Sequence, residues 1–313
     1  MRRLAVLPLL CLLGCADGGT DAFVAEAPAA LPEACPAPNF AEARAFTVEN
    51  VVLDRAGVGE LRADLFTPEG PGPHPGLAIF HGAAWVLADQ RLSYFVAKHY
   101  AESGFVVLNV NYRKAPATKI PGQVRDGVCA VRRLRAMAEE VGLAKDCVGV
   151  MGDSSGGHVA AMVALEGDRE DLQEGCEDAG GETANVRFAM PHYGVFDWDA
   201  MIARYSQAME VFFFPFVFAP EDDFRAYSPI RYADRRPEVD FFVSHGTHDK
   251  LAPFAQSTAF ADALEAGGHR VARNWIAGAD HSYLISVLYF SPPGRIAQAA
   301  ADAFLAESLA RTE

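Results

Sequence analysis

The sequence predicts one α/β domain built on a mostly parallel sheet with helices on both faces. Apolar, β-branched segments alternate along the chain with segments of helical periodicity, which is the pattern of such a sheet. The chain has 313 residues, of which 50% are hydrophobic, so it is long enough to bury one large core. Polar clusters that contain glycine follow four of the strands, where ligands bind in parallel sheets.

The predicted elements begin at Phe46, where the periodicity becomes regular. Residues 46–54 and 61–68 are expected to pair as a β-hairpin. Further strands are predicted, giving an eight-stranded sheet, at 76–82, 105–112, 148–151, 186–196, 239–246 and 270–276. Helices are predicted at 92–104, 122–142, 155–165, 257–266 and 297–310. These elements leave little or no room for a large cap domain.

The first residues of the chain differ in composition from the rest. Two arginines precede an apolar run at 4–13 that is too short to span a bilayer, which is typical of a secretory signal. The run ends in Leu-Leu-Gly-Cys, which resembles the bacterial lipobox. Residues 1–14 are therefore expected to be a lipoprotein signal peptide, and Cys15 is expected to be lipidated. The alternative is an ordinary signal peptide that is cleaved a few residues later.

Residues 15–45 are rich in alanine and proline, and they are expected to tether the folded domain, residues 46–313, to a membrane. This organisation predicts an exported, lipid-anchored protein of the cell envelope, in the outer membrane or facing the periplasm. The formal net charge of −14 argues against nucleic acid as a partner. The sequence leaves the oligomeric state open.

Four cysteines lie outside the signal and the lipidation site, namely Cys35, Cys129, Cys147 and Cys176. Export permits disulfides, and four cysteines allow three complete pairings. Cys147 begins one predicted strand and Cys176 precedes the next, so a Cys147–Cys176 bridge is expected. No spacing of cysteine or histidine indicates a metal site, and no cofactor is predicted.

The stretch GDSSG at 152–156 fits the pattern G-x-S-x-G and lies between a predicted strand and a predicted helix. In that setting the pattern is typical of a tight turn that exposes the central serine, Ser154, at the N-terminus of the helix. The partial positive charge at that end of the helix favours a developing oxyanion. The alternative is a structural turn with a capping serine.

His281 is the candidate base, because a serine hydroxyl is a weak nucleophile until a base accepts its proton. His281 follows the last predicted strand, and Asp249 follows the strand before it. The chain order of Ser154, Asp249 and His281 matches a known order of the catalytic triad. Asp280 and His248 are rivals by adjacency. Asp280 directly precedes the histidine and would have to turn back toward its ring, and His248 does not follow the last strand.

The HGAAW stretch at 81–85 follows the first parallel strand. Its backbone N–H groups, with the N–H of Ser155, are expected to face the carbonyl oxygen of a substrate and to form an oxyanion hole.

These motifs resemble those of the α/β-hydrolase superfamily. The resemblance is to the esterase/lipase group with HGGGW and GDSAGG motifs, which includes hormone-sensitive-lipase-like carboxylesterases and feruloyl-esterase-like relatives. It extends to NYRKAP at 111–116, IPGQVRD at 120–126 and FRAYSPI at 224–230. The resemblance implies an α/β-hydrolase fold that runs from about Phe46 to the C-terminus.

The resemblance also implies the role of each site residue. Ser154 would be the nucleophile, His281 the base and Asp249 its partner, and the oxyanion donors would be the backbone N–H groups of Ala83, Ala84 and Ser155. The family has glycine where this chain has the two alanines, and alanine costs on the order of 1 kcal/mol or more at a position that needs positive φ. The family also has alanine at 155, and the extra hydroxyl has no role that the sequence reveals.

The predicted function is that of a serine carboxylic ester hydrolase, which acts through an acyl-enzyme on short-chain or aromatic esters. An amidase of the arylformamidase or peptidase type would use the same triad. A polysaccharide deacetylase or feruloyl esterase is another alternative, and a catalytically silent binding protein on the same fold is a third.

The aromatic stretch before the Asp249 loop has two interpretations. Its phenylalanines either form an apolar wall of the substrate pocket or belong to the buried core. They are Phe212, Phe213, Phe214, Phe216 and Phe218. Trp85 is expected to pack beside the oxyanion loop rather than to contact the substrate.

Overall fold

The structure is a computed structural model, and it describes residues 35–55, 59–176, 179–205, 213–219, 223–285 and 288–312. The chain divides into two units, residues 1–30 and residues 31–313, and all described residues belong to the second. The predicted signal peptide, Cys15 and Phe212 lie outside the described residues. No helix within the described ranges is both long and apolar enough to cross a membrane.

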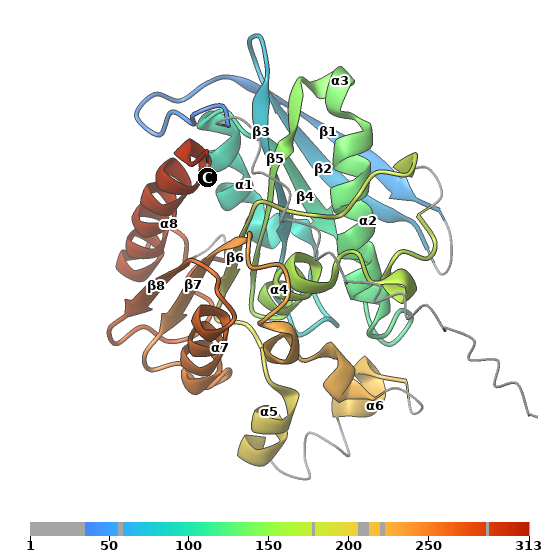
Figure 1. The fold of residues 1–313 in the computed structure, drawn as a ribbon, viewed down its shortest axis with the longest axis vertical. Coiled ribbons are helices and arrows are strands. Elements are labelled where there is room, and N and C mark those ends of the chain that lie inside the picture. The colour runs from blue at the N-terminus through green and yellow to red at the C-terminus, as the bar shows by residue number, and fades with distance from the viewer. Residues whose placement is uncertain are drawn as a thin grey trace, which may run out of the picture. The chain divides into compact units, whose positions relative to one another are not determined.

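The domain contains a sheet of eight strands in the order β1-β2-β4-β3-β5-β6-β7-β8 (Figure 1). The strands are β1 (Phe46–Asp54), β2 (Leu61–Pro68), β3 (His74–Phe80), β4 (Val106–Asn111), β5 (Leu143–Asp153), β6 (Phe188–His192), β7 (Asp240–Gly246) and β8 (Val271–Ile276). β2 is antiparallel to both of its neighbours, and the other pairs are parallel. The prediction of a mostly parallel, eight-stranded sheet is confirmed.

Helices cover both faces of this sheet (Figure 1). Successive residues of a strand point to opposite sides of the sheet, so the apolar strands present buried side chains to both layers of helices. Ala78 and Phe80 of β3 share one core cluster with α2, α4 and α7, whereas Leu77 and Ile79 share the other with α1 and α8. The α-helices are α1 (Tyr94–Glu102), α2 (Gly122–Ala136), α3 (Ala138–Val141), α4 (Ser155–Glu166), α5 (Trp198–Tyr205), α6 (Phe214–Val217), α7 (Ala255–Ala266) and α8 (Pro292–Ala310). Short 3-10 helices include Gln90–Ser93, Glu170–Leu172, Phe224–Tyr227 and Pro229–Tyr232.

Among the described residues between β6 and β7 are α-helices that the sequence periodicity did not predict. These are α5 and the single-turn α6, which lie at the bottom of Figure 1. Both are too short to display a helical repeat, and α6 contains Pro215 in its first turn. The sequence marked the part of this region around α6 as an aromatic stretch and predicted no element at the position of α5.

Two disulfides join the four cysteines, and the expected Cys147–Cys176 bridge is wrong. Cys35 is bonded to Cys147, and Cys129 is bonded to Cys176. Cys147 belongs to the core cluster that contains α1 and α8, whereas Cys176 belongs to the cluster on the other face of the sheet. Closeness along the chain therefore did not bring these two side chains together.

Residues 35–45, which we assigned to the tether, lie against the folded domain. Besides the disulfide, the backbone N–H of Cys35 donates to the carbonyl of Leu309 on α8 at 3.1 Å. The N–H of Arg44 donates to the carbonyl of Glu102 on α1 at 2.8 Å. The start of the domain is thereby fixed to the α1 and α8 face of the sheet.

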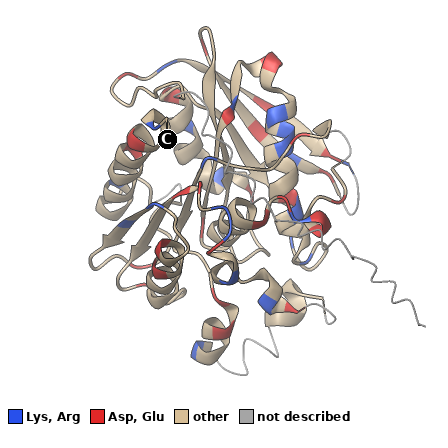
Figure 2. Ribbon diagram, in the orientation of Figure 1, with Lys and Arg blue, Asp and Glu red and all other residues tan. Residues whose placement is uncertain are grey.

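Arginine side chains along α2 form hydrogen bonds with the backbone of neighbouring parts of the domain. Figure 2 shows several Lys or Arg positions, in blue, along the ribbon of this helix. The Nε atoms of Arg125, Arg132 and Arg135 donate to backbone carbonyls of Asp171, Glu182 and Lys145, at 2.7, 2.8 and 3.0 Å. These guanidinium groups join α2 to the start of β5, to the 3-10 helix at Glu170–Leu172 and to the chain at Glu182.

Candidate active site

Ser154 occupies a strained turn between β5 and α4. Its backbone has φ 52° and ψ −118°, which few residues other than glycine adopt. The turn packs tightly on β3, because a Cβ atom at Gly156 would lie 2.0 Å from the carbonyl oxygen of Phe80. Only glycine fits there, and the serine hydroxyl is presented at the N-terminus of α4, as the G-x-S-x-G pattern predicts.

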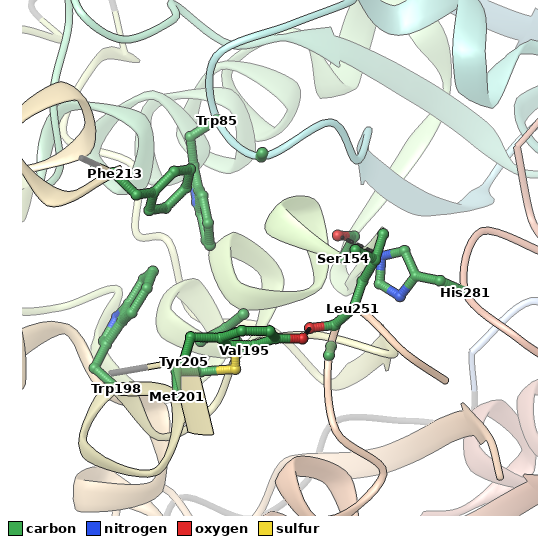
Figure 3. A pocket seen from close by; sticks show the side chains of 11 residues that line it. Trp85, Ser154, Val195, Trp198, Met201, Tyr205, Phe213, Leu251 and His281 are labelled. Carbon is green, nitrogen blue, oxygen red and sulfur yellow. Dashed lines mark hydrogen bonds between the residues drawn. The ribbon is translucent and has the colours of Figure 1, made fainter. Parts of the chain in front are cut away.

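The structure brings the three predicted triad side chains together. The Oγ atom of Ser154 lies 2.9 Å from Nε2 of His281, and Nδ1 of His281 lies 2.6 Å from Oδ2 of Asp249. When Nδ1 carries the proton and donates to Asp249, Nε2 is free to accept the serine proton. Figure 3 shows the side chains of Ser154 and His281 next to each other at the pocket.

Asp280, one of the two alternative candidates for the triad, makes hydrogen bonds to the backbone and not to the imidazole of His281. Its carboxylate accepts from the backbone N–H groups of Lys250 and His281, at 3.1 and 2.9 Å. Asp280 therefore fixes the loop that carries His281, while the imidazole ring faces Asp249. His248 donates its backbone N–H to the carbonyl of Ala279 at 2.9 Å.

His245 is a member of the site that the sequence did not predict. Its Nε2 lies 3.0 Å from Oδ2 of Asp249, the same oxygen that contacts His281, and its Nδ1 lies 2.6 Å from the hydroxyl of Ser257. The available signal was its place in HGTHD, four residues before Asp249 at the end of β7. Asp249 is thus held between two imidazoles.

The hydrogen bonds of Asp249 keep its carboxylate ionised. Burial alone raises the pKa of Asp249, but the hydrogen bonds from His245 and His281 outweigh it and hold the pKa well below its usual value. The other carboxylate oxygen, Oδ1, accepts from the N–H groups of Leu251 and Ala252 at 2.8 and 2.9 Å. An ionised, fixed carboxylate is what orients a catalytic histidine and stabilises its protonated form.

The predicted oxyanion loop contains three successive non-glycine residues with positive φ. Ala83, Ala84 and Trp85 have φ of 105°, 56° and 60°. The two alanines that stand where the family has glycine thus adopt backbone angles that glycine adopts without strain. Each alanine costs on the order of 1 kcal/mol or more of stability relative to glycine. Within the described residues, the backbone N–H groups of Ala83, Ala84 and Ser155 have no hydrogen-bond acceptor. They are available as donors to a bound ligand.

Asp153, directly before the nucleophile, is buried under the oxyanion loop. Its Oδ1 accepts from the N–H of Gly82 at 2.9 Å, and its Oδ2 accepts from the hydroxyl of Tyr193 at 3.2 Å. Burial raises the pKa of Asp153 to about 6, although the N–H of Gly82 and the charge of His281 oppose this shift.

An apolar cavity of about 260 Å³ opens beside Ser154 and His281. Figure 3 shows aromatic side chains at its left end and the reactive pair at its right. The other lining residues are Ala84, Trp85, Val195, Trp198, Met201, Tyr205, Phe213, Leu251 and Ala252. Trp85 is buried beside the oxyanion loop as predicted, but it also lines the cavity beside Ser154, contrary to the prediction that it packs away from the substrate.

The phenylalanines of the aromatic stretch divide between the two interpretations. Phe213 lines the cavity and its ring lies 6.3 Å from that of Trp85. Phe214 and Phe218 are buried against Trp198, with ring centroids 5.6 and 5.1 Å away. Phe216 is 52% exposed.

Within the described parts of the chain, no group of three or more His, Cys, Asp or Glu side chains is arranged to hold a metal ion.

The raised pKa of Asp153 predicts a pH-dependent cost to stability. Between pH 4 and pH 6 the unfolded chain loses the proton of this carboxyl before the folded protein does. The free energy of unfolding of the wild type, measured relative to Asp153→Asn, should therefore fall by on the order of 2 kcal/mol as pH rises from about 4 to about 6. Urea unfolding of both proteins at several pH values measures this difference. A difference that is constant or rises with pH would contradict the assignment.

Comparison with known proteins places this geometry in a family. A family model described as BD-FAE matches residues 63–264. Esterase LipQ of Mycobacterium tuberculosis is 33% identical over 216 residues, which are 67% of this chain and 50% of that protein. The probable carboxylic ester hydrolase LipM of the same organism is 30% identical over 205 residues, which are 62% of this chain and 45% of that protein. This chain thus spans about half the length of these curated relatives.

Solved structures of esterases share the fold. The propionate-bound esterase Est2 of Thermogutta terrifontis has a TM-score of 0.70 and 22% identity, over 86% of this chain and 96% of that chain. An esterase of Pyrobaculum calidifontis has a TM-score of 0.67 and 24% identity, over 85% and 86%. The predicted α/β-hydrolase fold is confirmed. The family-model match over residues 63–264, on this fold, shows that the chain belongs to the BD-FAE family.

Proposed function

We propose that this protein is a serine carboxylic ester hydrolase that acts through an acyl-enzyme on short-chain or aromatic esters. The observation that carries the proposal is the hydrogen-bonded series Ser154, His281 and Asp249, which opens onto an apolar cavity. The printed names of the relatives, esterase and carboxylic ester hydrolase, support the same chemistry.

The proposed reaction begins when Ser154 Oγ attacks the ester carbonyl and its proton passes to His281 Nε2. Asp249 stabilises the imidazolium that forms. The carbonyl oxygen becomes an oxyanion, which accepts hydrogen bonds from the N–H groups of Ala83, Ala84 and Ser155. His281 then returns the proton to the leaving alcohol, and an ester of Ser154 remains. Water that His281 deprotonates then attacks this ester. As the acyl bond to Ser154 Oγ breaks, His281 returns the proton to the serine, and the carboxylic acid is released.

The cavity favours a neutral, apolar group on the substrate. No lysine, arginine, aspartate or glutamate occurs among the described residues that line it, so a charged group would be desolvated there without a partner. Two tryptophans and Phe213 suit a flat ring or a short acyl chain. This apolar lining supports an ester with a small apolar group, and it offers few polar contacts to the hydroxyl groups of a polysaccharide.

Substitution of the nucleophile tests the proposal directly. Ser154→Ala should lower kcat for a p-nitrophenyl ester by about 10⁴-fold or more, because the acyl-enzyme cannot form. The purified wild type should be labelled by a fluorophosphonate, and Ser154→Ala should not. An ester should be hydrolysed faster than the matching amide, and the reverse would favour an amidase. If the wild type neither reacts with the probe nor hydrolyses esters, the silent binding protein is favoured instead.

The wall formed by Phe213 predicts a limit on acyl length. Phe213→Ala should enlarge the cavity and raise kcat/KM for octanoyl relative to butanoyl p-nitrophenyl ester several-fold, since each added CH₂ that is buried contributes about 0.8 kcal/mol. The matched control is Phe216→Ala, because Phe216 is 52% exposed and does not line the cavity. If the octanoyl-to-butanoyl ratio of kcat/KM is unchanged in Phe213→Ala, or changes equally in Phe216→Ala, Phe213 does not limit the acyl length.

We propose further that the protein is exported and anchored to a cell-envelope membrane through a lipid on Cys15. The apolar run at 4–13 and its Leu-Leu-Gly-Cys end support this placement. The two disulfides also support it, since disulfides persist in oxidising compartments.

Substitution of the proposed lipidation site tests the anchor. In a bacterial host that processes lipoproteins, the wild type should partition into Triton X-114 detergent, and Cys15→Ser should move to the aqueous phase. The matched control is Ser154→Ala, which should partition like the wild type. A wild type found in the aqueous phase would rule out the anchor.

A further inference from the structure

Both residues that flank Ser154 are linked to the peptide unit of the oxyanion loop that joins His81 to Gly82, Asp153 directly and Ser155 through Tyr112. On one side, Asp153 Oδ1 accepts the N–H of Gly82 at 2.9 Å. On the other side, the hydroxyl of Tyr112 donates to the carbonyl of His81 at 2.9 Å. A single peptide is therefore held at both its N–H and its C=O.

Ser155 belongs to this arrangement through its hydroxyl. Its Oγ lies 3.1 Å from the hydroxyl oxygen of Tyr112. Because the tyrosine proton points to the carbonyl of His81, the tyrosine oxygen accepts the proton of Ser155. Burial raises the pKa of Tyr112 above its usual value, so the tyrosine stays protonated and keeps its donor role. Both side chains are buried, with Ser155 1% and Tyr112 0% exposed.

The peptide held in this way directly precedes the strained residues of the loop. A run of positive φ persists only where the surrounding structure fixes the chain at both ends. Upstream, the ring of His81 stacks on that of Tyr112 with centroids 4.4 Å apart. At Gly82 a Cβ would lie 2.5 Å from Asp153 Oδ2. Downstream, the carbonyl of Trp85 accepts the N–H of Ala115 at 3.0 Å.

We propose that Ser155 is a positioning residue, whose hydroxyl acts through Tyr112 to hold the His81–Gly82 peptide and thereby the N–H groups of Ala83 and Ala84. The inference rests on the proposed esterase function. It gives the second serine a role different from that of Ser154, because its backbone N–H faces the substrate while its hydroxyl secures the other half of the oxyanion hole. This chain has alanines in the loop, so the loop has more strain to restrain than one with glycines.

A double-mutant cycle tests the proposal. Tyr112→Phe should lower kcat for a p-nitrophenyl ester about tenfold and leave KM nearly unchanged, because oxyanion contacts strengthen in the transition state. Ser155→Ala should lower kcat about threefold to fivefold, the value of one hydrogen bond. The double variant should match Tyr112→Phe, because the serine acts only through the tyrosine. Ser155→Ala should still be labelled by a fluorophosphonate.

The matched control is Tyr100→Phe. Tyr100 is equally buried, and its hydroxyl accepts from Gln298 on the opposite face of the sheet at 3.1 Å. This variant loses a buried hydrogen bond at a comparable cost in thermal stability, and its kcat and KM should equal those of the wild type. A fall in kcat with the control would show that loss of stability alone explains the effects.

Three outcomes overturn the inference while the wild type remains an active esterase. They are wild-type kcat in Ser155→Ala, effects that multiply in the double variant, or a rise in KM in place of a fall in kcat. If Tyr112→Phe does not fold, Ser155→Ala decides alone, since wild-type kcat in that variant overturns the inference and a fall at constant KM supports it. Loss of esterase activity and of labelling in the wild type itself would instead overturn the proposed function.

Discussion

The geometry of the site depends on one close contact between α4 and the end of β3. A Cβ at Gly156 would lie 2.0 Å from the carbonyl oxygen of Phe80 and 2.7 Å from that of His81. Phe80 is the last residue of β3 and leads directly into the oxyanion loop, while Gly156 lies two residues after the nucleophile. The same contact therefore sets the turn at Ser154 and the distance from that turn to the loop. A side chain at 156 would separate the two halves of the site.

Around this contact, the site combines unfavourable local features with strong restraints. Ser154, Ala83, Ala84 and Trp85 all have positive φ, and Asp153 is a buried carboxylate with a raised pKa. Each of these features costs stability by itself. The core on both faces of the sheet and the two disulfides offset that cost. Strain at a preorganised site with stability supplied elsewhere is a common arrangement in enzymes.

The parts of the structure that follow from repeating patterns were predictable from the sequence. Alternating strands and helices gave the sheet, and the strand ends gave Ser154, Asp249 and His281, which the structure brings within hydrogen-bond distance. Their chemical roles stay predictions. The disulfide pairing was predicted wrongly, because it depends on which face of the sheet each cysteine reaches. α5 was missed because it is too short to display a helical repeat, and the contact of Trp85 with the cavity arises from packing between segments far apart in the chain. His245 was missed although it lies only four residues before Asp249, because its contact with that carboxylate depends on how the chain turns after β7.

A crystal structure of the fluorophosphonate adduct would test the central claim most directly, which is that Ser154 carries the acyl group opposite the alanine loop. The phosphorus should be bonded to Ser154 Oγ, and the phosphoryl oxygen should lie about 2.7–3.1 Å from the backbone nitrogens of the loop alanines and Ser155. Phosphorus bonded to Ser155, or a phosphoryl oxygen that points away from these N–H groups, would contradict the account.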